Sequence, residues 1–372
     1  MTETATESQV VRWGIMSTAS IAPKNWQAIH RSGNGKVVAV ASRSLASSQQ
    51  FIADCQAVVS FDEVPRAIEG YDELLAADDI DAVYIPLPTG LRHEWVIKAA
   101  QAGKHVMCEK PCADSLEQLT EMVAACEKNN VQFMDGVMYM HAQRMNQVRE
   151  AIDQKVGKIK RIATQFSFFG GNEFDKGNIR TNSKLECFGC LGDLGWYTIR
   201  FTLWAMNYQA PVSVTARMLN AHHRDDSPDA VPMEIDCFLD FGGGTTATFY
   251  NSFINGHQQW AHVSGTEGFV HVPDFVLPYE GDQTKFSYCQ PAFDVNGCDF
   301  VMTENRTDVA IDEAGNSAAN SPEANLFRRF GEIVLSGEVD SHWPKISLLT
   351  QRVLDACLES AQNDGRRVEF AS

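Results

Sequence analysis

The chain has 372 residues, a length typical of two domains. Its hydrophobic content of 44% and charged content of 21% are ordinary for a globular protein, and a net charge of −17 argues against nucleic acid or an anionic membrane as a partner. No apolar run is long enough to cross a bilayer, and the N-terminus lacks the pattern of a secretion signal, so we expect a cytoplasmic protein.

The 10 cysteines are scattered, and only Cys108/Cys112 and Cys187/Cys190 lie close together in the sequence. A structural zinc site needs a second pair or two histidines at ligand spacing. We therefore expect reduced cysteines and no metal site.

The first apolar strand, residues 10–16, runs into a turn of small residues and then a helix. This layout presents backbone N–H groups to a pyrophosphate at the start of the helix. Ser17, Ala19 and Ala22 take the places of the usual glycines, which keeps the turn small but loses the conformational freedom of glycine. The same turn also occurs where a helix simply packs close to a strand.

The second strand, residues 36–41, ends in Ser42-Arg43-Ser44. In a dinucleotide-binding unit this position contacts the adenosine ribose, and an acidic residue there selects NAD. Arg43 between two hydroxyl side chains instead favours the 2′-phosphate of NADP. The alternative is an exposed arginine without a ligand.

Further strands follow at residues 82–85, 105–108 and 132–137, separated by helical patterns. Strands that alternate with helices indicate a doubly wound parallel sheet, in which ligands bind beyond the carboxyl ends of the strands. Glu109-Lys110-Pro111 stands directly after one of these ends, so Lys110 is a candidate for chemistry. The alternative is a surface salt bridge in a loop.

The periodicity changes near residue 140. Longer, alternating strands at residues 159–169, 212–219, 233–241, 245–253 and 257–263 are joined by glycine-rich hairpin signals, and two helices, 323–335 and 346–362, close the chain. We expect a mostly antiparallel sheet, with a first domain over residues 1–139 and a second over 140–372.

Within the second domain, Asp193 and Tyr197 are four residues apart and therefore share one face of a helix. A carboxylate beside a phenol in apolar surroundings is suited to proton transfer. The alternative is an acidic residue at a helix start and a tyrosine in the core.

Together, these motifs resemble the glucose-fructose oxidoreductase/inositol dehydrogenase (Gfo/Idh/MocA) family over nearly the whole chain. Within the family, a tyrosine at position 197 resembles the branch that contains dimeric dihydrodiol dehydrogenase, NADP-dependent xylose dehydrogenase and glucose-fructose oxidoreductase. The motifs that carry the resemblance are Gly14…Ser17-Thr18-Ala19-Ser20-Ile21-Ala22, Ala41-Ser42-Arg43, Pro86-Leu87-Pro88-Thr89, Glu109-Lys110-Pro111 and Gly192-Asp193-Leu194-Gly195-Trp196-Tyr197.

The resemblance implies a Rossmann dinucleotide-binding domain followed by an open-faced, mostly antiparallel sheet domain, an α/β fold joined to an α+β fold, with substrate bound between the two. It also implies that Lys110 is the essential lysine, with Asp193 and Tyr197 beside it. A free tyrosine has a pKa near 10, and a nearby ammonium group lowers it. We therefore expect Tyr197 to transfer the proton, Lys110 to tune Tyr197 and bind the substrate hydroxyl, and Asp193 to orient them; alternatively, Lys110 transfers the proton.

We expect NADP, or alternatively NAD, to be the cofactor. Thr89 departs from the family, which usually has asparagine there. The expected cofactor-binding residues are Ser17, Thr18, Ala19, Ser20, Ile21, Ser42, Arg43, Pro86, Leu87, Pro88, Thr89, His93, Glu109 and Lys110. The expected substrate-binding residues are Lys110, Tyr139, Arg180 and Trp196.

The predicted function is hydride transfer between the nicotinamide and a hydroxyl or carbonyl group of a sugar or a trans-diol. The alternative is a non-catalytic NAD(P)-binding sensor of the same fold, but retention of Lys110, Asp193 and Tyr197 favours an enzyme. On the family pattern we also expect a homodimer formed by the open sheet face, with Phe249, Phe253 and Trp260 as its apolar positions.

Overall fold

The computed structural model describes residues 10–171 and 173–370, which form two compact units. The first unit contains residues 10–112, 117–141 and 316–345; the second contains residues 113–116, 142–171, 173–315 and 346–370. The expected boundary between residues 139 and 140 lies close to the change of unit after residue 141. Residues 316–345, however, pack with the first unit rather than with the second half of the chain.

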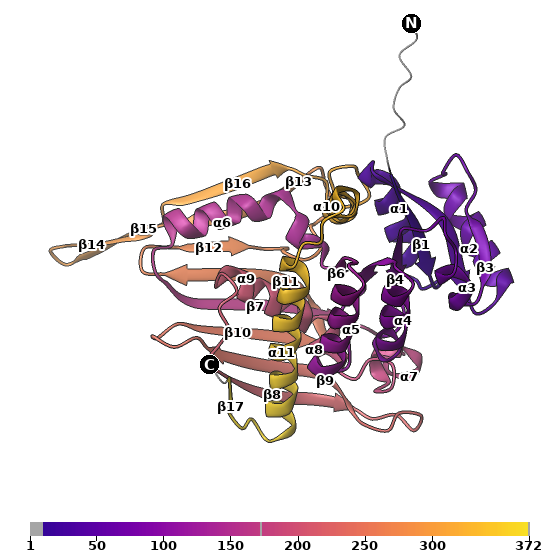
Figure 1. Cartoon of the computed structure of the whole chain (residues 1–372). Helices are drawn as coiled ribbons and strands as arrows, with labels where there is room; N and C mark the ends of the chain where they lie inside the picture. Colours follow the sequence, from indigo (N-terminus) through magenta and orange to yellow (C-terminus); the bar gives the residue numbers. More distant parts are fainter. Residues whose placement is uncertain (1–9, 172, 371–372) are drawn as a thin grey trace, which may run out of the picture. The chain divides into compact units, whose positions relative to one another are not determined.

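A six-stranded parallel sheet forms the centre of the first unit (Figure 1). Its strand order is β3-β2-β1-β4-β5-β6. From β1, the chain adds strands first on one side, to β3, and then on the other side, from β4 to β6, which confirms the expected doubly wound sheet. The strands are β1 (Val11–Met16), β2 (Gly35–Ser42), β3 (Arg66–Glu69), β4 (Ala82–Ile85), β5 (His105–Cys108) and β6 (Phe133–Asp135).

Helix α10 explains why a late segment belongs to the first unit. The Trp13 ring of β1 is fully buried and lies 5.2 Å from the ring of Phe327 and 5.1 Å from that of Phe330, so burial of these aromatic rings holds α10 against α1 and β1. The helices of this unit are α1 (Ala22–Ser32), α2 (Leu45–Val58), α3 (Tyr71–Leu75), α4 (Thr89–Gln101), α5 (Leu116–Lys128, from Glu117 on), the 3-10 helix η1 (Met138–His141) and α10 (Pro322–Ser336).

A nine-stranded sheet forms the second unit, and only its β7–β10 pair is parallel, which confirms the expected mostly antiparallel sheet. Its order is β16-β13-β12-β11-β7-β10-β9-β8-β17. The strands are β7 (Ile159–Phe169), β8 (Ser213–His222), β9 (Val231–Asp240), β10 (Thr246–Ser252), β11 (Ile254–Gly265), β12 (Phe269–Val272), β13 (Gln283–Cys289), β16 (Arg306–Asp312) and β17 (Val368–Glu369).

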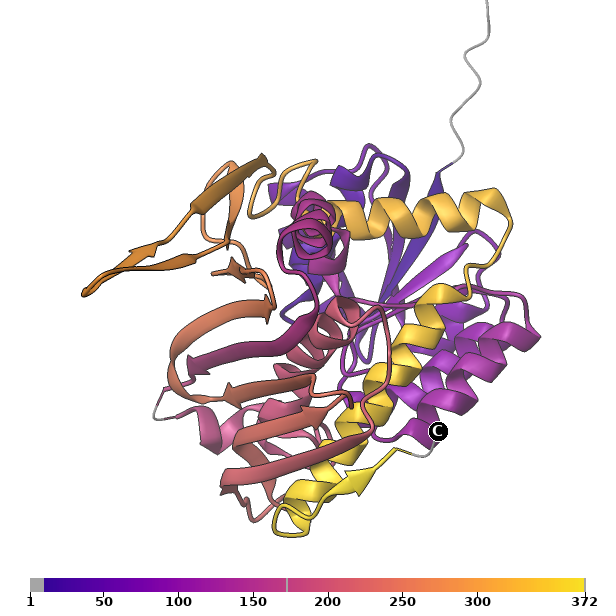
Figure 2. The ribbon, with the colours of Figure 1, turned by 90° about the vertical axis from the view of Figure 1, so that its left-hand side faces the viewer.

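Helices cover one face of this sheet (Figure 2). Phe249 and Phe253 are each 1% exposed on the covered side, so assigning them to the open face was wrong. The open face instead carries Phe238, Trp260 and His262, which are exposed or half-buried. The helices of this unit are α6 (Gln143–Lys155), α7 (Phe174–Gly177), η2 (Ile179–Thr181), α8 (Gly189–Asp193), α9 (Gly195–Ala205) and α11 (His342–Gln362, from Ile346 on).

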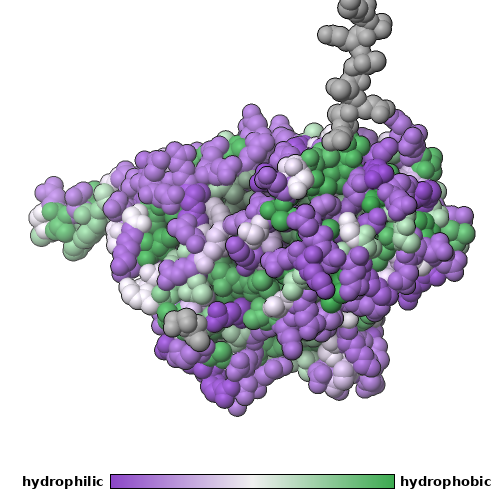
Figure 3. All heavy atoms as spheres, viewed as in Figure 1, coloured by the Kyte–Doolittle hydropathy of each residue, from purple (hydrophilic) through white to green (hydrophobic). Residues whose placement is uncertain are grey.

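Strands β14 (Ala292–Asn296) and β15 (Asp299–Thr303) form a separate two-stranded hairpin with an apolar surface (Figures 1 and 3). Phe300 is 74% exposed and stacks on Phe293 with ring centroids 5.7 Å apart. Across residues 10–171 and 173–370, no helix has the length and apolarity needed to span a membrane.

Candidate active site

The turn after β1 is built on a strained serine. Ser17 has a φ of 125°, a conformation that residues other than glycine rarely adopt. Its backbone N–H donates to the Ala41 carbonyl of β2 at 2.9 Å, and its hydroxyl accepts from the N–H of Ala19 at 3.1 Å. The serine therefore closes the turn that a glycine closes in the usual fingerprint. The turn lies at the carboxyl end of β1, where the sequence analysis places it. Thr18, Ser20 and Ile21 lie in the same turn before α1.

The three residues at the end of β2, Ser42, Arg43 and Ser44, have different surroundings. Arg43 is exposed, and within the described residues no carboxylate pairs with it. Ser42 is buried, and its hydroxyl donates to the Ser44 carbonyl at 2.7 Å and accepts from the Ser48 hydroxyl at 3.0 Å. Ser44 caps α2 by accepting from the N–H of Ser47. Arg43 is thus available to an anion, while the Ser42 hydroxyl holds the loop in place.

Arg92 links two of the predicted cofactor-binding loops of the first unit, the one after β4 and the one after β5. Its buried guanidinium donates to the Leu87 carbonyl at 2.7 Å, to the Thr89 hydroxyl at 3.0 Å and to the Pro111 carbonyl. The loop after β4 and the loop after β5 are therefore joined through one side chain. Sequence reasoning missed Arg92; the available signal was its position three residues after Thr89, on the same side of α4.

Glu109 is fixed by hydrogen bonds rather than exposed to solvent. The Tyr84 hydroxyl donates to its Oε1 at 2.6 Å, Asn25 donates to the same oxygen at 3.3 Å, and the Lys110 backbone N–H donates to Oε2 at 3.3 Å. Burial and then the Glu109 charge raise the pKa of Tyr84 well above its ordinary value, so the phenol stays a donor. Lys110 is half-buried directly beside this carboxylate.

Two other predicted residues of the first unit have defined positions. His93 of α4 lies with its Nε2 2.6 Å from a carboxylate oxygen of Glu121, which gives its ring a protein partner. Tyr139 is 1% exposed in η1. These positions do not support the predicted contact of His93 with the cofactor or that of Tyr139 with the substrate, and both stay predictions.

In the second unit, Asp193 and Tyr197 lie on either side of a break between two short helices. Asp193 ends α8, and Tyr197, 8% exposed, lies in the first turn of α9 with its ring 5.8 Å from that of Phe166. A Cβ atom on Gly195 would lie 3.1 Å from Asn251 Oδ1. A side chain at position 195 would therefore press on the neighbouring side chains of Asn251 and Leu191.

Arg180 is the cation of this cluster. Its Nε donates to Asp193 Oδ2 at 2.8 Å. The charge of Asp193 raises the pKa of Arg180 more than burial lowers it, and Tyr197 raises this pKa by a smaller amount. Arg180, which the sequence analysis predicted apart from the Asp193–Tyr197 pair, therefore joins that pair in one cluster. Trp196 is fully buried, so a direct substrate contact by its ring stays a prediction that its position does not support.

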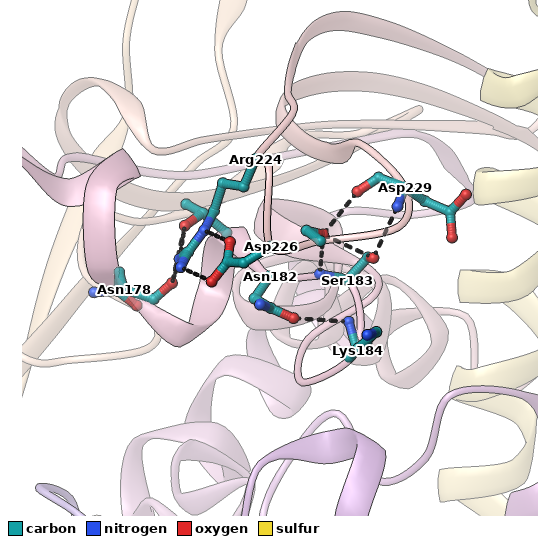
Figure 4. Close-up of polar contacts among 9 residues, drawn as sticks. Asn178, Asn182, Ser183, Lys184, Arg224, Asp226 and Asp229 are labelled. Carbon is teal, nitrogen blue, oxygen red and sulfur yellow. Dashed lines mark hydrogen bonds and ion pairs between the residues drawn. The ribbon is translucent and has the colours of Figure 1, made fainter.

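The segment that carries Arg180 is held by the loop between β8 and β9 (Figure 4). Arg224 donates to the Asn178 carbonyl at 3.0 Å and the Thr181 hydroxyl at 3.1 Å, and it pairs with Asp226. A second link joins the Ser183 and Ser227 hydroxyls at 2.9 Å. This loop positions residues 178–184 and with them Arg180. Sequence reasoning missed it, because no periodicity relates two loops more than 40 residues apart.

Within the part of the chain that the structure describes, no three His, Cys, Asp or Glu side chains are arranged to hold a metal ion. The side chains that approach one another in each unit are donors, acceptors and charges suited to a dinucleotide and to proton transfer.

Comparisons with known proteins agree with this chemistry. Residues 11–137 match the model of an oxidoreductase family with an NAD-binding Rossmann fold, and residues 145–271 match the GFO/IDH/MocA C-terminal domain. The chain is 27% identical over 358 residues to D-xylose 1-dehydrogenase (NADP(+)) 2 of Haloferax volcanii, covering 96% of this chain and 99% of the relative. It is 28% identical over 284 residues to trans-1,2-dihydrobenzene-1,2-diol dehydrogenase of Xenopus laevis, covering 74% and 80%.

A solved structure shares the fold. The 3-ketoreductase of Actinomadura kijaniata, crystallised in complex with NADP and TDP-benzene, superposes with a TM-score of 0.75 at 24% identity, covering 95% of this chain and 98% of that protein.

Proposed function

Because the chain belongs to the Gfo/Idh/MocA oxidoreductase family, we propose that it transfers hydride between a nicotinamide cofactor and a CH–OH or carbonyl carbon of a sugar or a trans-diol. The observation that carries the proposal is that both domain models of this family match, one after the other, along the chain. The names of the two relatives, a xylose dehydrogenase and a dihydrodiol dehydrogenase, support this substrate class.

We propose NADP as the preferred cofactor, with NAD as the alternative. Among the residues that the structure describes, no carboxylate pairs with the exposed Arg43, which lies at the strand end that contacts the adenosine ribose, in a chain of net charge −17. The turn at Ser17 and the loops joined by Arg92 all follow carboxyl ends of the same parallel sheet, which is where a dinucleotide binds. We propose that residues 1–139 bind the cofactor and that residues 140–372 bind substrate and form the subunit interface.

The proton transfer that accompanies hydride transfer is proposed for Tyr197, with Lys110 binding the substrate hydroxyl. When bound, the cofactor supplies the hydride chemistry. A cation beside a phenol favours its ionised form, and Arg180 interacts electrostatically with Tyr197 from within the same unit. Asp193 then holds Arg180 in position at 2.8 Å. The alternative, proton transfer by Lys110, uses the same residues.

A substrate screen tests the proposal. Purified chain is incubated with NADP or NAD and with D-xylose, other aldoses or trans-diols, and the absorbance of the reduced cofactor is followed. Turnover of at least one compound is expected. Cofactor binding without turnover of any compound would instead support the alternative, a non-catalytic sensor; the relatives, which are named enzymes, favour catalysis.

We further propose that the protein is cytoplasmic and assembles as a homodimer at least. The support for assembly is the open face of the nine-stranded sheet, where Phe238 is 42% exposed.

A further inference from the structure

Three side chains follow the carboxyl ends of three neighbouring strands. In the order β3-β2-β1, Tyr71 follows β3 after one glycine, Arg43 follows β2 and Ser17 follows β1. The Gly70 N–H donates to the Ser42 carbonyl at 2.8 Å, and the Ser17 N–H donates to the Ala41 carbonyl at 2.9 Å. Because both neighbours are bonded to the end of β2, Tyr71 and Ser17 stand on either side of Arg43.

The Ser17 hydroxyl and the Arg43 guanidinium are both near enough to the Tyr71 phenol to lower its pKa. The Tyr71 ring packs edge-on against Trp95, with centroids 5.0 Å apart, and is half-buried. Burial raises the pKa of Tyr71, opposed by the nearby Ser17 hydroxyl and the Arg43 charge, so the phenol is neutral at pH 7 and keeps a proton to donate.

The strain at Ser17 indicates that its hydroxyl makes contacts that glycine, the unstrained residue at this position, lacks. Glycine would adopt a φ of 125° without steric cost, whereas serine pays for it. The hydroxyl accepts from the Ala19 N–H at 3.1 Å and lies near the Tyr71 phenol, which a glycine could not do. Serine therefore couples the turn at the end of β1 to the residue at the end of β3.

We propose that Tyr71 is a specificity residue for the cofactor: its hydroxyl donates a hydrogen bond to the 2′-phosphate of NADP beside Arg43, and Ser17 positions it. This inference rests on the proposed function. A neutral phenol donor and a guanidinium suit a phosphate, because hydrogen bonds to a charged acceptor are about twice as strong as those between neutral groups. NAD carries only a neutral hydroxyl there, so it gains less from Tyr71.

Calorimetric titration of the full-length protein with NADP, NAD and 2′,5′-ADP tests the inference without requiring turnover. Tyr71→Phe is expected to raise the Kd for NADP and 2′,5′-ADP by about tenfold and to leave that for NAD within about twofold. Ser17→Gly is expected to weaken NADP binding in the parent, but to add little in the Tyr71→Phe background, because Ser17 acts through Tyr71. Tyr279→Phe, a change at an exposed tyrosine of the second unit, is the matched control.

Equal weakening of NADP and NAD, unchanged binding in Tyr71→Phe, or additive effects of the two substitutions would each overturn the inference. Circular dichroism of the variants separates lost binding from lost folding. A parent protein that binds neither cofactor would contradict the proposed function itself, whereas one that binds NADP with a selectivity unaffected by Tyr71→Phe would contradict only this inference.

Discussion

Tyr197 is the residue on which the proposed chemistry depends most. If it transfers the proton, Tyr197→Phe keeps the fold and cofactor binding but lowers kcat by roughly 10²–10⁴, the usual contribution of a general acid or base. The aromatic ring is retained, so packing against Phe166 should persist. Steady-state kinetics on a substrate found by the screen, with Tyr279→Phe as control, measures the effect.

Lys110→Met is expected to reduce turnover at least as much, because it removes a substrate contact and a positive charge. An unchanged kcat in Tyr197→Phe would assign the proton to Lys110 and leave Tyr197 as a core residue.

Arg43 tests the cofactor preference independently of catalysis. Arg43→Ala should weaken NADP binding by about 1–3 kcal/mol, the range for a charge-assisted contact, and leave NAD binding nearly unchanged. Fluorescence titration with both cofactors measures this, and Arg31→Ala, at the far end of α1, serves as a control arginine. Similar losses for NADP and NAD would refute the role of Arg43.

The loop between β8 and β9 acts on the cluster through side-chain hydrogen bonds to residues 178–183, so its effect should be local. Arg224→Met removes the bonds to Asn178 and Thr181 and should raise hydrogen–deuterium exchange across residues 178–184 while leaving strand β7 protected. Lys184→Met, a change at an exposed lysine of the same segment, is the control. Unchanged exchange in Arg224→Met would show that other contacts hold the segment.

The elements differ in how far the sequence predicts them. Strand β5 was predicted with its observed bounds, because the apolar residues Val106 to Cys108 stand directly before a charged pair followed by proline. Strand β3 was missed, since its four residues are half-buried or exposed and show no apolar run. That omission concealed Tyr71, whose place beside Arg43 follows only from the pairing of β2 with β3.

The candidate site was predictable where one motif carries several residues and not where distant loops meet. Asp193, Gly195 and Tyr197 lie in one short segment, so their joint role could be proposed from spacing. Arg224 and Arg92 act by donating hydrogen bonds to backbone carbonyls of other loops. Every residue type has a backbone carbonyl, so the sequence of the accepting loop does not reveal such a bond. The wrong assignment of Phe249 and Phe253 to the open face has another cause: alternation of apolar and polar residues predicts that a strand has two faces but does not say which face the helices cover.

For the protein as a whole, two neighbouring histidines on the open sheet face predict a dependence of stability on pH. Burial, then the charges of His271 and Arg161, lowers the pKa of His262; burial, then the charge of Arg306, lowers the pKa of His271. As the pH falls through about 6.5, the unfolded chain binds protons at these rings before the folded chain does, so the free energy of unfolding decreases.

The double variant His262→Gln/His271→Gln should lose this dependence, on the order of 1 kcal/mol between about pH 7 and pH 5. Urea unfolding at several pH values measures it, with the exposed His223→Gln as control. A parent and a double variant with parallel pH profiles would contradict the assignment.

The open face also predicts the state of assembly. Phe238, Trp260 and His262 lie on that face, and an apolar or aromatic sheet face left without helices usually marks an interface. We expect light scattering at micromolar concentration to give a particle of at least twice 41.2 kDa. Trp260→Asp should shift the protein towards the monomer, because it places an unpaired charge within the interface.

Phe300→Asp, on the separate β14–β15 hairpin, is the matched control, because it removes an equally apolar ring that is 74% exposed but lies outside the nine-stranded sheet. Dissociation by Phe300→Asp and not by Trp260→Asp would move the interface to the hairpin. A parent particle of 41.2 kDa would refute assembly altogether. If Trp260→Asp alone gives the monomer, its kinetics would then show whether the proposed reaction requires the assembled protein.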